Sequence, residues 1–511
     1  MRGTIHRGAE LKANNQLECD VLVIGSGPGG SLAAAKLAEI GASVIVLEEG
    51  GQFTAPDFDM HEESAYPRMY QDNGSRTTDD LSIMILQGRC IGGGSTVNWM
   101  TSLRAPDTTL KHWKNRHGVE GIDSSALRPH WDEVEARLHI HVAAPEDVNR
   151  NNAVLWDGAT RLGYQVTRLP RNSDRCDNLG YCGMGCPIDA KRTAGLTYLD
   201  DAMKAGTEIY ANCRVTRLDT SGGRATGAQA QVLDPDTHQP TGNTLQVKAG
   251  RVVLAAGALN TPRILLRSGV EHKALGRRTW LHPVVATVGV FRDRIDPWYG
   301  SPQSVGSLHF ADRGSRMGFL IEAPPMHPML AALASPGFGL AHREIMSMLP
   351  YTNSLIGLTI DGFDESENGG TVRTGAGGRL RFSYPLRERN HEAMKEAMKA
   401  MARIQLAAGA TRVLTLHDDP VEIRSESDLG KIDARSMAPG RLSVFTAHQM
   451  GGCSMSEDPA RSIVNSRGRM HQLSNVYVCD GSVFPTGLGV NPMLSIYGLS
   501  SFFSQHIQSS S

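Results

Sequence analysis

The most constraining feature of the 511-residue chain is a strand, turn, helix and strand pattern that begins at Asp20. The run DVLVIG is apolar and rich in β-branched residues, GSGPGG follows at once, and SLAAAKLAEIG is an alanine-rich helical pattern that ends at Gly41. A second apolar run, ASVIVL, then leads into Glu48. Glycines at the first turn of such a unit and an acid after its second strand are the fingerprint of a dinucleotide site.

Each residue of this fingerprint has a distinct expected role. Gly25 permits the tight turn, Gly27 lets the backbone approach a pyrophosphate, and Gly30 allows the helix to pack closely. Glu48 follows Gly30 by 18 residues, where its carboxylate can accept hydrogen bonds from a ribose diol. With both strands and the acid in place, the pattern favours a dinucleotide site over an ordinary glycine turn.

The length and charge of the chain narrow the class of ligand. A chain of 511 residues exceeds what one core usually organises, so we expect two domains or one domain with a large insertion. Lysine and arginine number 52 and aspartate and glutamate 53, for a formal net charge of -1. This balance gives no electrostatic reason to expect nucleic acid or an anionic membrane surface as a partner. We therefore expect a small-molecule ligand.

Cysteine content and apolar runs indicate the compartment. Eight cysteines are too few for a secreted disulfide scaffold of this length. The N-terminal MRGTIHRGAELKANNQLE holds no apolar leader, and no stretch approaches the roughly 18 consecutive apolar residues of a membrane span. The sequence predicts no integral membrane segment and a cytoplasmic location, with periplasmic export beside a partner subunit as the open alternative.

Three further segments accompany the fingerprint. Residues 87–104 have the sequence QGRCIGGGSTVNWMTSLR, a second glycine cluster followed by small polar residues. Residues 252–269, VVLAAGALNTPRILLRSG, predict a buried strand, a small-residue turn and a helix opening near Pro262. The last is the C-terminal VYVCDGSVFPTGLGVNPMLSIYGLSSFFSQHI. In this order, and over residues 20–507, the four motifs resemble the glucose-methanol-choline (GMC) family of flavin oxidoreductases.

The resemblance implies FAD as the dinucleotide. Some family members bind the flavin covalently through a histidine just before the asparagine of the second motif, and Val97 occupies that place here, so non-covalent FAD is expected. A helix starting near Pro492 would direct its positive end at the flavin pyrimidine. The residues implied to hold FAD are Gly25, Gly27, Gly30 and Glu48 for its ADP part, Gly92, Gly93, Ser95 and Asn98 for the pyrophosphate and flavin edge, Val215 for the adenine side, and Asp480 and Gly481 for the ribityl chain.

The same resemblance places the chemistry at His448 and Asn491. His448, in FTAHQMGGCSM, is in register with the family's catalytic histidine and precedes a Gly-Gly pair that leaves space for a substrate. A neutral imidazole there can take a hydroxyl proton as general base while hydride leaves for the flavin. Asn491 follows at the family's partner position, at an expected helix N-cap with Pro492 as the first helical residue. His282, in LHPVV, also resembles a family position and is expected to stabilise a loop.

The predicted fold is α/β, with a Rossmann-like FAD-binding domain of the GMC/PHBH-like type and an interleaved α+β substrate domain built on an antiparallel sheet. VVATVGVFRD, NSLIGLTIDGF and RLRFSYPL alternate as strands of that sheet, and HEAMKEAMKAMARIQLAAG predicts a helix ending at Gly409. The expected boundaries are 18–120, 188–280 and 435–511 for the FAD-binding domain, and 121–187 and 281–434 for the substrate-binding domain.

Three thiols, Cys176, Cys182 and Cys186, lie together in CDNLGYCGMGCP. Zinc is disfavoured because a fourth ligand and a nearby histidine are missing. The spacing is similar to that of bacterial FAD sugar dehydrogenases of the family, which carry a [3Fe-4S] cluster, and to the long-chain type of alcohol oxidase, from which Leu179 departs by replacing a frequent further cysteine. A metal cluster, a loop of reduced thiols and a disulfide stay open.

Taken together, the sequence predicts an FAD-dependent enzyme that oxidises the CH-OH group of a small or medium, fairly apolar alcohol by hydride transfer to flavin N5, with dehydrogenase favoured over oxidase. The alternatives are a sugar dehydrogenase with a [3Fe-4S] relay to a cytochrome partner, and a flavin-dependent lyase or decarboxylase on the same fold. A flavin carrier without catalysis is disfavoured by the presence of both His448 and Asn491. Oxygen, a quinone and a cytochrome, with or without an accessory electron-transfer subunit, all stay open as acceptors.

Overall fold

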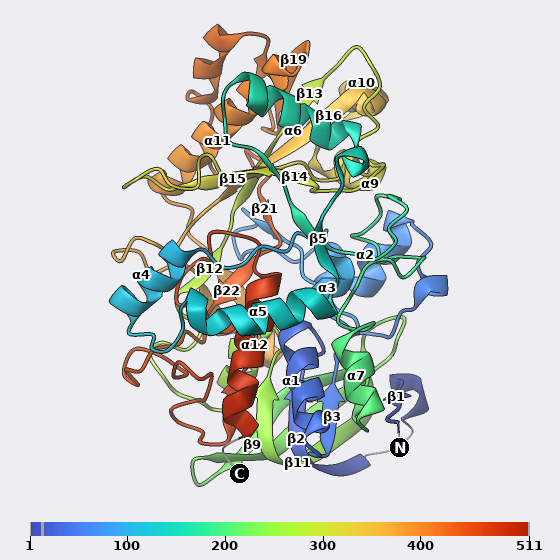
Figure 1. Ribbon diagram of the computed structural model, residues 1–511, viewed down its shortest axis with the longest axis vertical. Helices are drawn as coiled ribbons and strands as arrows, with labels where there is room; N and C mark the ends of the chain where they lie inside the picture. The colour runs from blue at the N-terminus through green and yellow to red at the C-terminus, as the bar shows by residue number, and fades with distance from the viewer. Residues whose placement is uncertain (1, 12–14, 509–511) are drawn as a thin grey trace.

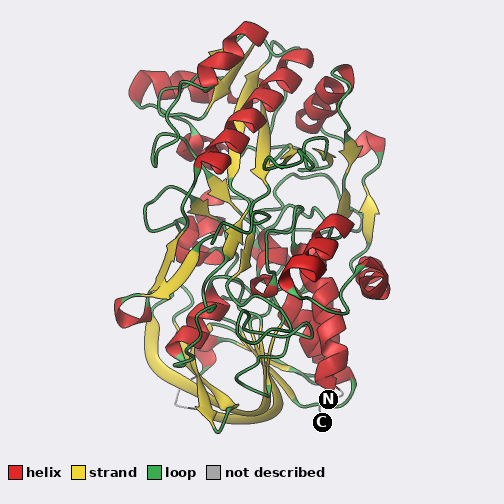
Figure 2. Cartoon of the chain, turned by 90° about the vertical axis from the view of Figure 1, so that its left-hand side faces the viewer, coloured by secondary structure: helices red, strands yellow, loops and turns green. Residues whose placement is uncertain are grey.

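The computed structural model describes residues 2–11 and 15–508, with one large sheet toward each end of its long axis (Figure 1). The two marked chain ends lie at the same end of the molecule as the first sheet. A quarter turn away, the strands of the two sheets are separated by a middle region rich in loops (Figure 2). No helix in the described ranges is both long and apolar enough to cross a membrane.

The first sheet carries the predicted fingerprint. Its central strands pair in parallel, and residues 21–24 and 44–47 are buried without alternation, as expected for parallel strands covered on both faces. The long β11 pairs with β10 along its first half and with the C-terminal β23 along its second. The strand order is β1 (Ile5–His6), β8 (Glu208–Tyr210), β3 (Val44–Leu47), β2 (Asn15–Ile24), β11 (Pro240–Leu254), β10 (Arg224–Leu233) and β9 (Cys213–Ser221), with β23 (Val476–Val478) beside β11.

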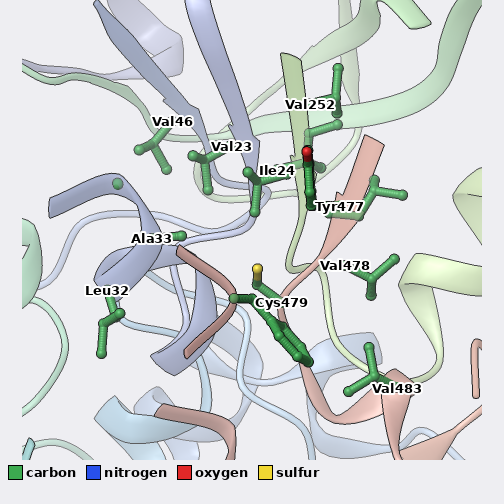
Figure 3. Packing of buried hydrophobic residues seen from close by; sticks show 14 of the residues in the cluster. Val23, Ile24, Leu32, Ala33, Val46, Val252, Tyr477, Val478, Cys479 and Val483 are labelled. Atoms are coloured by element: carbon green, nitrogen blue, oxygen red, sulfur yellow. The ribbon is translucent and has the colours of Figure 1, made fainter. Parts of the chain in front are cut away.

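Helix α1 (Pro28–Glu39) packs between this sheet and its neighbouring helices because its buried side chains are small. Ala33 of α1 points toward strand residues and Cys479 in the core (Figure 3). A Cβ added to Gly29 would lie 1.6 Å from the carbonyl oxygen of Cys479, so only glycine allows this approach. The neighbouring helices are α7 (Tyr198–Lys204) and α12 (Met493–Gln508), and α5 (Ser124–Arg137) packs in turn on α12.

Helix α5 packs with the FAD-binding segments and not with the predicted substrate domain. Residues 121–187 were predicted to belong to the substrate domain, yet α5 packs on α12, and Leu127, Trp131 and Val134 are buried in the core of the first sheet. His130 Nδ1 lies 2.8 Å from Ser501 Oγ across this contact. The apolar face of α5 has its partner on α12, which is distant in sequence, so no local pattern indicated the assignment. The remaining domain boundaries stay a prediction.

The second sheet is antiparallel except for the pair β4 and β21. Its strands come mainly from the predicted substrate domain, but β4 and β21 belong to the segments assigned to the FAD-binding domain. The order is β20 (Glu422–Ile423), β19 (Arg412–Thr415), β13 (Val284–Val290), β16 (Thr352–Thr359), β15 (Phe319–Glu322), β14 (Val305–Ser307) and β6 (Thr167–Arg168), with β21 (Phe445–Thr446) beside β13 and β4 (Met84–Ile85) beside β21.

Two helices, α6 (Arg150–Arg161) and α11 (Glu388–Ala407), cover this sheet (Figure 1). The predicted helix and its end are confirmed, since Ala408 caps α11 and Gly409 follows at a φ of +104°. The methionines of α11 are core residues. Met394, Met398 and Met401 are all completely buried.

Smaller elements connect the two sheets. The segment RLRFSYPL forms β18, which pairs with β17 in a separate hairpin and not in the second sheet as predicted. That hairpin packs on α8 (Asn260–Arg267), whose Arg263 Nε donates to the Gly378 carbonyl at 3.0 Å. The other elements are α2 (Glu62–Met69), α3 (Gly94–Val97), α4 (Asp107–His117), α9 (Pro328–Ala334), α10 (Gly339–Ser347), the hairpin β17 (Thr371–Thr374) and β18 (Leu380–Ser383), and the pairs β5 (Ile140–Val142) with β7 (Pro170–Asn172) and β12 (Thr279–Leu281) with β22 (Gln449–Gly451).

Candidate active site

A cavity of about 270 Å³ lies where the two sheets meet. Its walls include the glycine turn after β2, helix α3, the turn before α8 and residues of the second sheet. Most of the predicted site residues line it together, although they come from segments far apart in sequence. These are Gly25, Gly27, Glu48, Gly93, Ser95, Asn98, Val215, Asp480, Gly481, His448, Asn491 and Pro492.

The two glycine loops face each other across this cavity. Gly25 has a φ of +101°, which suits the tight turn predicted for it. Gly27 is the N-cap of α1, and a Cβ added to it would meet only Gly93 Cα, at 3.9 Å. A Cβ on Gly93 would lie 2.9 Å from Gly27 Cα. Side chains at either position would therefore fill a space that opens onto the positive end of a 12-residue helix, an arrangement that favours a bound anion.

Glu48 and Ser26 join the two loops. Glu48 Oε2 accepts from the Ser26 amide at 3.0 Å and from its hydroxyl at 2.7 Å, and Oε1 accepts from the Gly50 amide at 2.9 Å. The Gly92 amide in turn donates to Ser26 Oγ at 3.1 Å. Burial raises the pKa of Glu48, and these hydrogen bonds oppose that rise.

Gly30 and Gly92 stand apart from the other predicted site residues because they do not line the cavity. A Cβ on Gly30 would lie 2.0 Å from the Gly25 carbonyl oxygen, which confirms the close packing expected of it. Gly92 has a φ of +88° and a Cβ there would lie 2.4 Å from Thr96 Oγ1. Both glycines therefore allow the tight backbone packing of the two loops on the side away from the cavity.

Asp480 fastens the C-terminal motif to the turn before α8. Its Oδ2 accepts from the Gly257 amide at 2.9 Å and from Thr261 Oγ1 at 2.6 Å, and Oδ1 accepts from the Ser482 amide at 2.8 Å. Burial raises the pKa of this carboxyl. The side chain thus brings two of the sequence motifs to the same wall of the cavity.

His448 and Asn491 meet at the boundary between the two sheets. His448 lies between β21 and β22, and its Nε2 is 3.5 Å from Asn491 Nδ2. Asn491 is 6% exposed, and its Oδ1 has no hydrogen-bond partner although it is buried. Both residues line the cavity, so the unpaired oxygen points to a missing polar ligand. Burial lowers the pKa of His448 from 6.5 to about 4, which keeps the ring neutral near pH 7.

The start of α12 differs slightly from the prediction. The helix begins at Met493, and the Pro492 carbonyl accepts the first helical bond, from the Ile496 amide at 2.9 Å. Pro492 therefore holds the cap position, and Asn491 precedes it. Because Asn491 is not needed to cap the helix, its side chain is free to face His448.

His282 contacts His448 directly, in addition to the loop support that was expected of it. Its ring is completely buried, and its Nδ1 lies 3.0 Å from Nδ1 of His448. The Gly489 amide donates to its Nε2 at 3.4 Å, which still ties the ring to the loop before Asn491. Burial and the neighbouring His448 hold the pKa of His282 well below its usual range, so it is neutral.

This contact controls which nitrogen of His448 is a base. Two neutral rings that meet at Nδ1 share one proton between these atoms. When His282 provides it, as the hydrogen bond from the Gly489 amide to His282 Nε2 favours, His448 carries its own proton on Nε2, where Asn491 Nδ2 cannot accept it. When His448 provides it, Nε2 is free to accept a proton from a ligand in the cavity. The position of one buried proton therefore switches His448 between donor and acceptor.

Glu322 completes this polar group and was not predicted. It ends the apolar β15, is 1% exposed, and accepts from Gln303 Nε2 at 2.5 Å. Gln303 Oε1 accepts from Thr101 Oγ1 at 3.0 Å, and both of these residues line the cavity. Burial raises the pKa of Glu322 to about 7, opposed by a hydrogen bond with Asn491. The signal in the sequence was a lone acid at the end of the fully apolar run FLI.

Lys191 links the thiol loop, residues 176–187, to the cavity wall. This lysine is 1% exposed, and its Nζ donates to the carbonyls of Thr96 at 2.8 Å, Asn98 at 2.6 Å and Cys182 at 2.9 Å. Burial lowers its pKa to about 8. Tyr70 adds a parallel link, because its hydroxyl contacts the carbonyls of Val97 at 3.2 Å and of Gly183 at 2.6 Å. Through Lys191 and Tyr70, the thiol loop is thus hydrogen-bonded to the backbone of helix α3 and of Asn98, and we call this its bracing role.

Two family models described as GMC oxidoreductase match the chain, one at residues 66–284 and the other at residues 370–500. Together these segments cover more than half of the chain. The chain belongs to the GMC oxidoreductase family. A model described as FAD binding domain matches residues 20–56 of this GMC oxidoreductase, the region of the predicted fingerprint.

Individual relatives agree with the family. A long-chain-alcohol oxidase from Arabidopsis thaliana is 31% identical over 94% of this chain, and an uncharacterised GMC-type oxidoreductase from Mycobacterium tuberculosis is 32% identical over the same share. The chain spans 66% of the length of that plant protein and 74% of the mycobacterial one. A second Arabidopsis long-chain-alcohol oxidase, 29% identical, is spanned to 65% of its length.

Solved structures confirm the fold of this GMC oxidoreductase. Pyridoxine 4-oxidase from Mesorbium loti superposes with a TM-score of 0.71 at 20% identity, covering 96% of this chain and 100% of the other. A formate oxidase of Aspergillus oryzae gives a TM-score of 0.72 at 16% identity, covering 97% and 99%. At these identities the likeness establishes the α/β fold with its FAD-binding part.

FAD fits the residues present in this GMC oxidoreductase. The facing glycines leave a cradle that any Cβ would fill, the N-terminus of α1 favours a diphosphate, and Asn491 Oδ1 lacks a partner beside the cavity. Val97 occupies the place of the covalent attachment histidine, so FAD is expected to be non-covalent. The atom-by-atom assignment of FAD contacts stays a prediction.

The thiol loop shows no preformed site for an iron–sulfur cluster among the described residues. The three thiols are free, and their sulfur atoms are not among the groups close enough to share one ion. Burial raises the pKa of Cys176, which disfavours the thiolate that such a cluster binds. We expect anaerobically purified enzyme to show flavin absorption without stoichiometric iron or acid-labile sulfide. Iron bound in proportion to flavin would contradict this expectation.

Proposed function

We propose that this GMC oxidoreductase oxidises the CH-OH group of an apolar alcohol of small or medium size to a carbonyl. The observation that carries the proposal is the contact of neutral His448 with Asn491 at the cavity wall, with His282 behind it. Bound FAD would supply the two-electron oxidant that accepts the hydride. The plant relatives, named as long-chain-alcohol oxidases, support an alcohol as the donor.

His448 would act as general base in this reaction. Nε2 can accept the hydroxyl proton of the substrate in the tautomer whose Nδ1–H donates to His282; in that tautomer His282 carries its own proton on Nε2 and gives up the 3.4 Å hydrogen bond from the Gly489 amide. The pKa of about 4 keeps Nε2 of His448 unprotonated over most of the pH range. Asn491 would orient the substrate oxygen through its amide, which supplies both a donor and an acceptor. The two side chains together would fix the oxygen before the carbon-bound hydrogen is transferred.

The cavity wall supports an apolar substrate. On the side of the second sheet it is lined by aliphatic and aromatic side chains, including Val284, Ile356, Leu358 and Phe445. A charged or strongly hydrated donor would lose its hydration there without replacement. This wall argues against a sugar as the preferred donor.

A panel of primary alcohols of increasing chain length, with sugars as the contrast, tests the proposal. Each is offered to flavin-loaded enzyme with a dye acceptor, under air and under argon. We expect net dye reduction with alcohols. Equal dye reduction under air and under argon, without hydrogen peroxide, would indicate a dehydrogenase. Absence of flavin reduction by every alcohol, in enzyme that retains FAD, would contradict the proposal, and conversion without net electron transfer would favour a lyase.

Glu322 should make the stability of the enzyme pH-dependent. Its pKa is raised from 4.5 to about 7, so between these values the folded protein holds a proton that the unfolded chain releases. Stability should therefore fall as pH rises through this window, by up to about 3 kcal/mol. The variant Glu322→Gln keeps the shape and removes the titration. Denaturant unfolding gives the free energy of unfolding of both proteins at about pH 5 and about pH 8. Subtracting the pH-dependent change of the variant from that of the wild type cancels the contribution of the other titrating groups.

A further inference from the structure

A second group of potential ligands lies outside the cavity described above. His112 and His117 project from α4, and Glu365 comes from the loop between β16 and β17. Their ligand atoms all lie within 4.8 Å of one another, and no other such group of three or more occurs in residues 2–11 and 15–508. None of the three residues lines the flavin cavity.

The distances match a tetrahedral metal site. Nε2 of His112 and Nε2 of His117 lie 3.2 Å and 3.1 Å from the same oxygen, Oε1 of Glu365. Nitrogen and oxygen ligands about 2.0–2.2 Å from a zinc ion are separated by about 3.3 Å at tetrahedral angles. The three atoms could thus bind one ion with little movement.

The two imidazole nitrogens are available to a metal, because both Nε2 atoms are buried without a hydrogen-bond partner. His117 is 8% exposed, and its buried Nε2 has no hydrogen-bond partner of acceptable geometry. Arg278 lies 3.8 Å from the other carboxylate oxygen, Oε2, and leaves Oε1 available.

We propose that His112, His117 and Glu365 bind a divalent ion of the zinc class. Two imidazoles and one carboxylate are a donor set that zinc accepts, with a fourth position left for water. Glu365 is 40% exposed in its side chain, so the ion can enter from solvent. The positive charges of Arg278 and Arg461 near His117 should make the affinity moderate.

The position of the site gives the ion a structural role. Helix α4 is already tied to the loop before Asn491, through Trp113 Nε1 to Thr486 Oγ1 at 2.7 Å and Thr109 Oγ1 to the Leu488 carbonyl at 2.8 Å. An ion would add a bond from the same helix to the loop that holds Glu365. It would clamp two segments that meet only in the folded chain.

Metal content of flavin-loaded enzyme tests the proposal without reference to activity. Enzyme stripped with a chelator and dialysed against buffered Zn²⁺ should retain about one ion per chain. Glu365→Gln and His117→Gln should lose it while keeping FAD, and His139→Gln, at an exposed histidine, should retain it. Glu365→Gln decides the matter if the buried His117 variant fails to fold.

Two outcomes would overturn the site. Wild-type enzyme that holds flavin but no zinc would do so, as would zinc retained by both Glu365→Gln and His117→Gln. The second result would locate the ion elsewhere, including at the thiol loop. Substitution with Co²⁺ provides a further check, because nitrogen and oxygen ligation should give no thiolate charge-transfer band.

Discussion

Anaerobic reduction of the bound flavin by substrate should slow by about 10²–10⁴-fold when His448 is replaced by alanine. The ring lies 3.5 Å from Asn491 and 3.0 Å from His282, and His448 is the only histidine among the described residues that line the cavity. Flavin bleaching in stopped flow measures the effect directly, before any external acceptor is involved.

The control for this variant is His272→Ala, at a half-buried histidine that contacts the Pro459 carbonyl and does not line the cavity. It should bleach at the wild-type rate. Flavin content and the flavin absorption spectrum should be the same in all three proteins, because His448 is assigned to the proton and not to cofactor retention. Bleaching of His448→Ala at the wild-type rate would show that another group takes the proton.

The variant Lys191→Met should bind FAD poorly and melt at a lower temperature. Its ammonium serves three buried carbonyls, those of Thr96, Asn98 and Cys182, and methionine has a similar shape but donates to none of them. Each buried group left without a partner costs about 1–3 kcal/mol. Since α3 and Asn98 line the cavity, the loss should reach the cofactor.

Flavin fluorescence released on dilution and the midpoint of thermal unfolding measure the two effects. Lys431→Met, at a lysine whose side chain is 62% exposed, is the matched control and should change neither. Lys191→Arg keeps a charge and several donors and should recover part of the FAD retention. A Lys191→Met protein with wild-type flavin affinity would contradict the bracing role of the thiol loop.

Local motifs explain how much of this site could be predicted. Gly25, Gly27 and Glu48 belong to consecutive elements, so their spacing alone specifies how they meet. His448 and Asn491 were predicted through their resemblance to a family pattern, and the structure brings both to the cavity. Their catalytic roles stay predictions.

The parts that the sequence did not reveal depend on contacts between distant segments. His282 meets His448 across 166 residues, and Lys191 reaches Thr96 across 95. Glu322 acquires its unusual pKa only from burial beside Asn491. The same reason explains α5, whose apolar face matches a helix that ends the chain. No periodicity or composition carries such information.

The pairing of β23 with β11 also sets the order in which the enzyme can be completed during synthesis. The turn at Gly25 emerges early, but Asp480 and the strand that covers β11 follow about 450 residues later, which takes roughly 20–90 s at cellular rates of translation. Until then, an edge of the first sheet is uncovered and one wall of the cavity is missing. We therefore expect FAD to bind only after nearly the whole chain has been synthesised. Until then, the uncovered sheet edge exposes the nascent chain to aggregation.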